Sequence, residues 1–157
     1  INYAIFVNTL ITNDPFKMDV KKTLDHINNQ VFKNTLMTTL GIKVVEVGKD
    51  FVVATMPVDS KVYQPDALLH GGATVALAET VGSLASHISV DLEKYYVKGL
   101  EITANHLKSV KNGLVTATAK PIHKGKTTHL WEVKVENDQG DLISLIKLTT
   151  IVLPKKK

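Results

Sequence analysis

Glu79 is the residue of this sequence best placed to do chemistry. It is the only formal charge between Gly71 and Val90, in a stretch of otherwise apolar and small residues. Burial among apolar neighbours disfavours a charged carboxylate, so such a group must be paired, hydrogen-bonded or used. Ser83 follows one helical turn later, and the two could position a base or a nucleophile beside a carbonyl carbon. The alternative is a surface glutamate paired with a lysine.

The run His70-Gly71-Gly72 supplies a second chemical feature just before this stretch. Glycine lets a ligand approach the backbone closely, and the free amides at a helix start point toward developing negative charge. Such amides suit the oxyanion of a thioester under attack, and this kind of stabilisation is commonly the largest catalytic contribution in acyl transfer. The alternative is a Gly-Gly turn that binds nothing.

Other common kinds of site have no sequence signature here. The remaining histidines show no metal-ligand spacing such as H-E-x-x-H, so we expect no metal and no cofactor. There is no G-x-S-x-G elbow, Walker loop or dinucleotide fingerprint. With no cysteine in the chain, a thiolate nucleophile and a disulfide framework are excluded. The absence of cysteine also favours a reducing, cytoplasmic location.

The charge of the chain permits an anionic partner without indicating nucleic acid. The formal net charge is +4 and the pI about 9.2, yet the lysines are scattered apart from a final run at 155–157. No helix-turn-helix, zinc finger or aromatic ribonucleoprotein motif accompanies them, so we expect no nucleic acid partner. A small phosphorylated ligand would suit the same charge. Gly71 to Val90 is barely membrane length and is diluted by Gly, Ser and Thr, so a transmembrane span is not expected.

The elements that position these residues follow from hydrophobic periodicity. A helix is predicted from His70 to about Ile88, with a core-facing stripe at helical spacing. The stripe consists of Leu77, Val81, Leu84 and Ile88. The opposite side is small and almost uncharged, so either a sheet of the same subunit or another subunit must cover it. That side consists of Val75, Glu79, Gly82, Ser83 and Ser86.

A shorter helix at 23–32 and six strands complete the prediction. The strands are expected at 42–47, 51–56, 99–107, 114–121, 128–136 and 142–153. The order β-β-α-β-β-β-β buries its one long helix only if a curved antiparallel sheet wraps it, an α+β arrangement. At 157 residues the chain suits one domain. We assign 18–157 to it and residues 1–17 to an N-terminal extension.

Four segments together carry a family resemblance. They are Gln64-Pro65, LLHGGATVALAET at 68–80, GLEITANHLKSV at 99–110 and KPIHKGKTTHLWEVKV at 120–135. From about Thr23 to Leu153, the chain resembles the hotdog-fold acyl-CoA thioesterases. The likeness is strongest to the branch that contains phenylacetate-pathway, 4-hydroxybenzoyl-CoA and 1,4-dihydroxy-2-naphthoyl-CoA thioesterases. The HGG run followed at this spacing by an A-E-[ST] helix is more specific than either half.

This resemblance implies a site and an assembly. Glu79 would be the general base or nucleophile, and Ser83 would assist the attacking water. The Gly71 amide would polarise the thioester carbonyl, helped by His70 and Gln64. In this branch the active site lies between two subunits, so the resemblance implies a homo-oligomer, a dimer of dimers.

The resemblance also implies how coenzyme A is bound. The CoA contacts would come from Lys108, Ser109, Gly125, Lys126 and Thr127, and lysines at such places suit phosphate. Lys108 departs from relatives that carry arginine there, which would weaken bidentate phosphate binding. The implied activity is hydrolysis of an acyl- or aroyl-CoA, which needs only water. Two alternatives remain open: a non-catalytic acyl-CoA-binding module, and a hotdog acyl-thioester dehydratase or hydratase.

Overall fold

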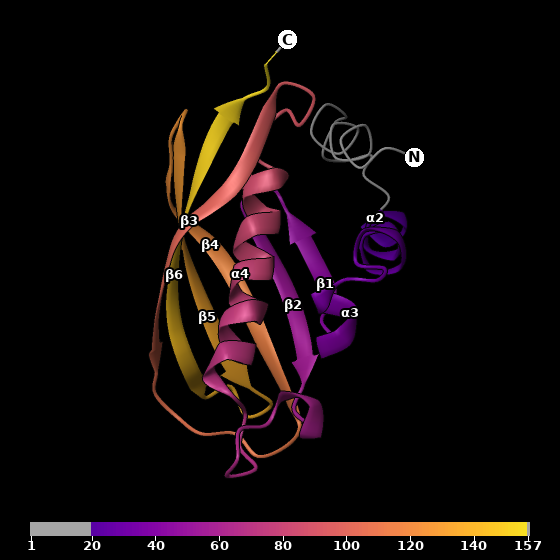
Figure 1. Cartoon of the computed structure of the whole chain (residues 1–157), viewed down its shortest axis with the longest axis vertical. Helices are drawn as coiled ribbons and strands as arrows, with labels where there is room; N and C mark the ends of the chain where they lie inside the picture. The colour runs from indigo at the N-terminus through magenta and orange to yellow at the C-terminus, as the bar shows by residue number, and fades with distance from the viewer. Residues whose placement is uncertain (1–19, 157) are drawn as a thin grey trace.

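The computed structural model of the chain describes residues 20–156, in which an antiparallel sheet wraps one long helix (Figure 1). The N-terminal part contains helix α2 (Val20–His26), a π-helical turn η1 (Ile27–Val31) and helix α3 (Leu36–Leu40). A short 3₁₀ turn, η2 (Ser60–Val62), precedes the long helix α4 (Gly71–His87). The strands are β1 (Lys43–Gly48), β2 (Phe51–Pro57), β3 (Tyr95–His106), β4 (Leu114–Lys124), β5 (Thr128–Asn137) and β6 (Leu142–Pro154).

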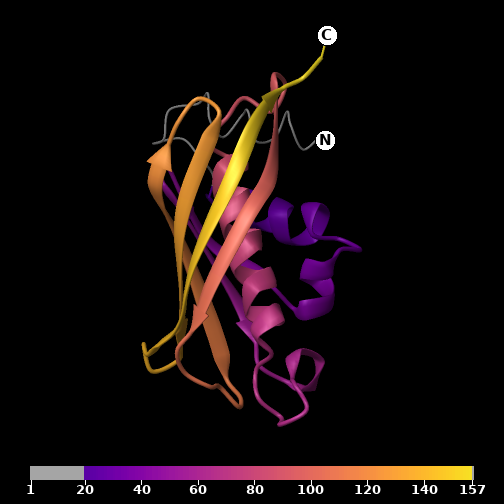
Figure 2. The same cartoon turned by 60° about the vertical axis from the view of Figure 1, so that its left-hand side comes forward.

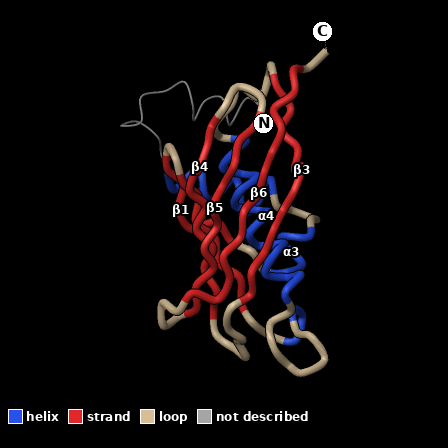
Figure 3. The backbone as a smooth tube through the Cα atoms, turned by 90° about the vertical axis from the view of Figure 1, so that its left-hand side faces the viewer, coloured by secondary structure: helices blue, strands red, loops and turns tan. Residues whose placement is uncertain are grey.

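The sheet has the strand order β1-β2-β4-β5-β6-β3, with every neighbouring pair antiparallel. The α+β architecture and the β-β-α-β-β-β-β order of the long elements are therefore confirmed. Strand β3 follows α4 in the chain and pairs with the last strand, β6. Strands β1 and β3 therefore form the two edges of the sheet (Figure 3). Local pattern could not predict this order, because the pairing of β3 with β6 joins segments far apart in the chain.

Strand β3 is longer than its sequence indicated. It begins at Tyr95, four residues before the predicted start, and its register shifts between Gly99 and Glu101. This shift marks a β-bulge, a feature common at sheet edges. Most β3 side chains are exposed, including Leu100 and Tyr96. The described structure thus presents a long edge strand with apolar residues open to solvent.

Helix α4 packs along the concave face of the sheet (Figure 2). Leu77, Val81 and Leu84 are buried there as predicted. The covered arc is wider than the predicted stripe, because Gly82 and Ser86 are also buried against the sheet. A Cβ at Gly82 would lie 2.6 Å from Leu148 Cδ2 on β6. Of the two predicted covers for the small-residue side, the sheet of the same subunit is therefore the one that covers these two residues.

A polar cluster lies inside the core beneath the C-terminal half of α4. Trp131 Nε1 donates to Ser86 Oγ at 2.6 Å, and Ser86 Oγ lies 2.7 Å from Thr150 Oγ1. His129 Nδ1 lies 3.3 Å from the same oxygen. All four side chains are buried, so their polar atoms need partners inside the protein, and His129 has one more in the Gly125 backbone. Its hydrogen bonds connect Ser86 of α4 to strands β5 and β6 and so hold the helix in place against the sheet.

The N-terminal helices lie on the side of α4 away from the sheet (Figure 2). The predicted helix at 23–32 is present as α2 followed by η1, while α3 has no counterpart in the prediction. Helix α3 is only five residues long and is capped at its C-terminus by Gly41, whose φ of 70° is the left-handed conformation that favours glycine. The proposed extension 1–17 lies outside the described residues. No helix within residues 20–156 is long and apolar enough to cross a membrane.

The buried histidine of the core cluster makes stability depend on pH. Desolvation by burial, reinforced by nearby Lys124, holds the pKa of His129 below its ordinary value. The unfolded chain takes up a proton on this residue below about pH 6.5, and the folded chain resists it. The free energy of unfolding should therefore fall as the pH drops below that value. His87 adds to the effect, because burial lowers its pKa too.

Replacing His129 should remove part of this pH dependence. We expect His129→Gln to lose less unfolding free energy than wild type as the pH is lowered from about 7 to about 5. Urea denaturation at a series of pH values measures the difference. Thr150→Val is the matched control, because it removes a hydroxyl from the same cluster but no titrating group. Equal pH slopes for wild type and His129→Gln would contradict the assignment.

Candidate active site

The N-terminus of α4 is built by His70. Its backbone is extended, with φ −71° and ψ 131°, and its Nδ1 accepts a hydrogen bond from the Gly72 amide at 2.8 Å. The Ala73 and Thr74 amides donate to the His70 carbonyl. The Gly71 N–H has no acceptor within residues 20–156. His70 is therefore the helix cap, and the amide that it leaves free belongs to the residue predicted to polarise a carbonyl.

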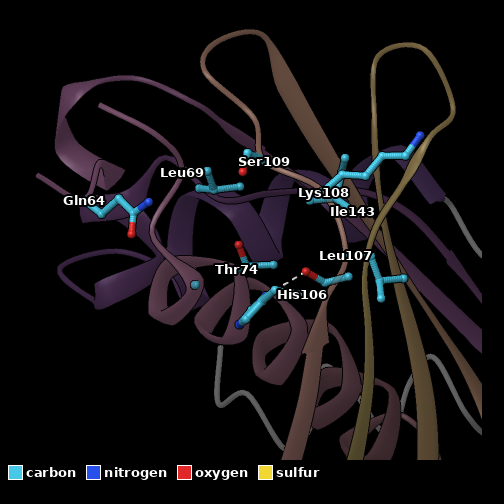
Figure 4. Close-up of a pocket in the computed structure, with 10 residues that line it drawn as sticks. Gln64, Leu69, Thr74, His106, Leu107, Lys108, Ser109 and Ile143 are labelled. Carbon is cyan, nitrogen blue, oxygen red and sulfur yellow. Dashed lines mark hydrogen bonds between the residues drawn. The ribbon is translucent and has the colours of Figure 1, made fainter. Parts of the chain in front are cut away.

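Four of the predicted site residues line one pocket beside this helix start (Figure 4). The pocket has a volume of about 260 Å³ and contains Gln64, Gly71, Lys108 and Ser109. These residues come from the loop before α4, from α4 itself and from the segment after β3. Since they are up to 45 positions apart, the fold, not the local sequence, brings them together. We call this cavity the Gly71 pocket.

His106 is a residue of the Gly71 pocket that sequence reasoning did not select. It is the last residue of β3, and its Nδ1 lies 2.8 Å from the Ser144 hydroxyl, the dashed line in Figure 4. On the other side of the ring, a Cβ at Gly71 would lie only 2.7 Å from Nε2. The quoted segment GLEITANHLKSV contains this histidine, but only its position beside Gly71 distinguishes it from the other histidines.

Glu79 and Ser83 line a second, largely apolar pocket, which we call the Glu79 pocket. Its volume is about 440 Å³, and its other walls come from η1, α3 and the outer face of α4. They include Phe32, Leu36 and Met37. The predicted neighbourhood of Glu79 and Ser83 on one face is thus present. His87, one turn beyond Ser83, donates from Nδ1 to the Ser83 carbonyl at 2.7 Å and also lines this pocket.

The environment of Glu79 differs from the one predicted. Its side chain is exposed in the single chain, so the apolar burial inferred from the sequence is wrong for the isolated subunit. The alternative of a lysine salt bridge is not found either, since no ion pair or hydrogen bond involves the carboxylate within residues 20–156. Its Oε1 lies 3.4 Å from where a Cβ at Gly99 would stand. Glu79 is therefore an accessible carboxylate beside the edge strand β3.

Within one chain the predicted site residues form separate groups. Glu79 follows Gly71 by eight residues, which is about 12 Å along a helix axis. His70 is not among the residues that line the Gly71 pocket, but lines another cavity with Leu40, Lys61 and Tyr63. Gly125, Lys126 and Thr127 form the β4–β5 turn, next to the start of β3 and the end of β6, whereas His106 pairs with Ser144 at the opposite end.

The lysine of the Gly71 pocket, Lys108, forms an ion pair with Asp141. Lys108 Nζ lies 2.7 Å from Asp141 Oδ1, and both side chains are about half exposed. The hydrogen bond from Lys108 lowers the pKa of Asp141 from its ordinary value. Such an exposed pair is weak enough for Lys108 to exchange its partner for a phosphate. Among residues 20–156, no group of three or more His, Asp or Glu side chains could hold a metal ion.

Comparison with known proteins identifies the family. The family model described as the Thioesterase superfamily matches residues 67–144. The 1,4-dihydroxy-2-naphthoyl-CoA hydrolase of Escherichia coli K12 is 40% identical over 133 residues, which are 85% of this chain and 96% of that protein. This chain belongs to the Thioesterase superfamily.

Further relatives of this thioesterase agree with the assignment. The proofreading thioesterase EntH of Cronobacter turicensis is 39% identical over 125 residues, covering 80% of this chain and 90% of the relative. The crystal structure of a mutant of thioesterase PA1618 from Pseudomonas aeruginosa superimposes with a TM-score of 0.82 at 43% identity, covering 84% of this chain and 94% of that one. The predicted hotdog fold and thioesterase class are confirmed. The roles of individual residues stay predictions.

The capping role of His70 can be separated from a chemical role. We expect His70→Ala to lower the free energy of unfolding by about 1 kcal/mol, because the Gly72 amide loses its acceptor. His70→Asn should restore most of that stability, since asparagine is a good N-cap. Chemical denaturation measures both. If His70 also assists catalysis, His70→Asn will stay defective in thiol release, and full activity of the stable variant would assign it to capping alone.

Proposed function

We propose that this chain hydrolyses the thioester of an acyl- or aroyl-CoA to a free carboxylic acid and coenzyme A. The free amide of Gly71 at the start of α4, open to a pocket that also contains Gln64, is the observation that carries the proposal. Both groups can donate hydrogen bonds to one carbonyl oxygen. Membership of the Thioesterase superfamily supports the same reaction. We keep the cytoplasm as the proposed location, because the chain has no cysteine.

Glu79 and Ser83 are the proposed groups on the attacking side. As a general base, Glu79 takes a proton from water while the water oxygen adds to the thioester carbon. As a nucleophile, its carboxylate adds directly and forms an anhydride that water then cleaves. In both routes the C–S bond breaks and the departing thiolate takes up a proton. The Ser83 hydroxyl, on the same pocket wall, can orient the water.

The acyl group is proposed to occupy the Glu79 pocket. That pocket is apolar apart from its α4 side, and its volume of about 440 Å³ can hold an aromatic ring or a short aliphatic chain. The relative from Escherichia coli is named as a hydrolase of 1,4-dihydroxy-2-naphthoyl-CoA, an aroyl thioester. These observations favour an apolar acyl or aroyl group over a charged one.

One subunit does not suffice for this reaction, so we propose that two subunits build each site. The attacking atom must lie about 3 to 3.5 Å from the carbonyl carbon, yet Gly71 and Glu79 of one chain are separated by about 12 Å. Strand β3 is an exposed edge that can pair with a second copy. Antiparallel pairing with Gly99 opposite His106 of the second copy would bring Glu79 of one chain to the Gly71 pocket of the other.

The same pairing accounts for the predicted CoA-binding residues, which lie at opposite ends of the sheet within one chain. It places the Gly125–Thr127 turn of one copy at the end of the joint sheet that carries Lys108 and Ser109 of the other. Phosphate and pantetheine contacts can then come from both chains, with Lys108 released from Asp141. We propose that two such dimers associate into the dimer of dimers that the family resemblance implies.

Removal of the Glu79 charge tests the reaction. Glu79→Gln should reduce thiol release from a panel of aroyl- and fatty acyl-CoAs at least about a hundredfold, because positioned acid–base groups contribute on that scale. Circular dichroism and mass measurement in solution check that the variant folds and assembles. The control, Glu46→Gln, changes an exposed carboxylate on β1 and should keep wild-type turnover. Retained turnover in Glu79→Gln would refute the catalytic role.

Subunit mixing tests the shared site. Glu79→Gln and Gly71→Ala should each be inactive alone, the second because a Cβ would press on His106. A mixed dimer contains one site with both residues intact and one with neither. Refolding the two variants together should therefore restore about a quarter of wild-type activity, since random pairing makes half the dimers mixed. No recovery, with mixed dimers detected by native mass spectrometry, would place the complete site within one chain.

A further inference from the structure

The His106–Ser144 pair links the Gly71 pocket to the core. The two residues are direct cross-strand partners on β3 and β6, and the His106 Nδ1 to Ser144 Oγ distance is 2.8 Å. Ser144 is fully buried, whereas His106 is exposed to the pocket. The proposed reaction has so far used neither residue.

The ring of His106 is held from both sides. Ser144 contacts Nδ1, and the start of α4 lies against Nε2, where even a single added carbon at Gly71 would come within 2.7 Å. The Nε2 atom is therefore beside the residue whose amide has no acceptor within residues 20–156. Gly71, from the start of α4, and His106, labelled in Figure 4 at the end of β3, thus line the same pocket.

The Ser144 hydroxyl determines which ring nitrogen carries the proton. A neutral imidazole has one donor nitrogen and one acceptor nitrogen. Within residues 20–156 the Ser144 side chain has no hydrogen-bond partner except His106. If Nδ1–H donated to Ser144, the hydroxyl proton would be buried without an acceptor, which is unfavourable. The hydroxyl therefore donates to Nδ1, and the ring proton lies on Nε2.

We propose that Ser144 is a positioning residue that holds His106 in the Nε2–H form, so that Nε2–H and the Gly71 N–H together bind the thioester oxygen. As the attacking oxygen bonds to the thioester carbon, the carbonyl π electrons move onto the thioester oxygen. The two N–H groups stabilise its negative charge, and no proton is transferred. The electron pair on the thioester oxygen then re-forms the carbonyl bond, while the C–S bond breaks and the thiolate leaves with the negative charge. This inference rests on the proposed function for its chemistry.

The tautomer can be measured without turnover. Long-range ¹H–¹⁵N spectra of protein labelled at histidine, recorded near pH 9 where histidines are generally neutral, distinguish the two forms. His106→Gln assigns the signal. We expect the Nε2–H form in wild type, a loss of this preference in Ser144→Ala and its return in Ser144→Thr, which keeps the hydroxyl. Ser86→Ala, a buried hydroxyl away from the pocket, controls for lost packing and should leave the tautomer unchanged.

Kinetics of the same variants give the second readout. His106→Gln should lower kcat about a hundredfold, as loss of one oxyanion donor does, and Ser144→Ala about tenfold. In both, KM should stay near wild type, and Ser144→Thr should recover kcat. An Nδ1–H form in wild type, or an unchanged tautomer and kcat in Ser144→Ala, would overturn the assignment. A correct tautomer in a protein without thioesterase activity would instead overturn the proposed function.

Discussion

The distance between α4 and the sheet depends on a contact at Gly82 that leaves no room for a side chain. Gly82 lies against Leu148 of β6, and a Cβ there would come within 2.6 Å of a Leu148 methyl carbon. This approach, with the hydrogen bond between Trp131 and Ser86, fixes the rotation of the helix. The rotation in turn directs Glu79 out of the core. The start and the middle of α4 also meet different parts of β3, since Gly71 lies beside His106 and Glu79 lies beside Gly99.

Much of the fold could be predicted because its periodicities are strong. Alternating apolar residues located all six strands within a few residues, and the Leu77, Val81, Leu84 spacing located the buried side of α4. The strand order could not be predicted, because pairing between β3 and β6 depends on tertiary packing. For Gly82 and Ser86 the sequence left two covers open, the sheet of the same subunit and a second subunit. A small polar residue looks the same in sequence whether its own sheet or a second subunit covers it.

Some residues of the candidate site could likewise be predicted from the sequence, and others could not. Glu79 and the His70-Gly71-Gly72 run could be recognised because their chemistry is local to one helix and its start. His106 and Ser144 could not, since a histidine at a strand end and a serine 38 residues later gain meaning only when β3 and β6 pair. The exposure of Glu79 could not be predicted either. The apolar sequence around it is buried on the sheet side, while the carboxylate itself projects from the opposite side.

The core beneath α4 has a consequence for optical spectroscopy. Trp131 is the sole tryptophan of the sequence, and it is fully buried between α4 and the sheet. Its indole nitrogen is hydrogen-bonded, and the His129 ring meets it edge-on with centroids 6.2 Å apart. Tryptophan emission from this protein therefore originates at one dry location with a histidine as neighbour. The signal therefore reports whether the helix and the sheet are packed against each other.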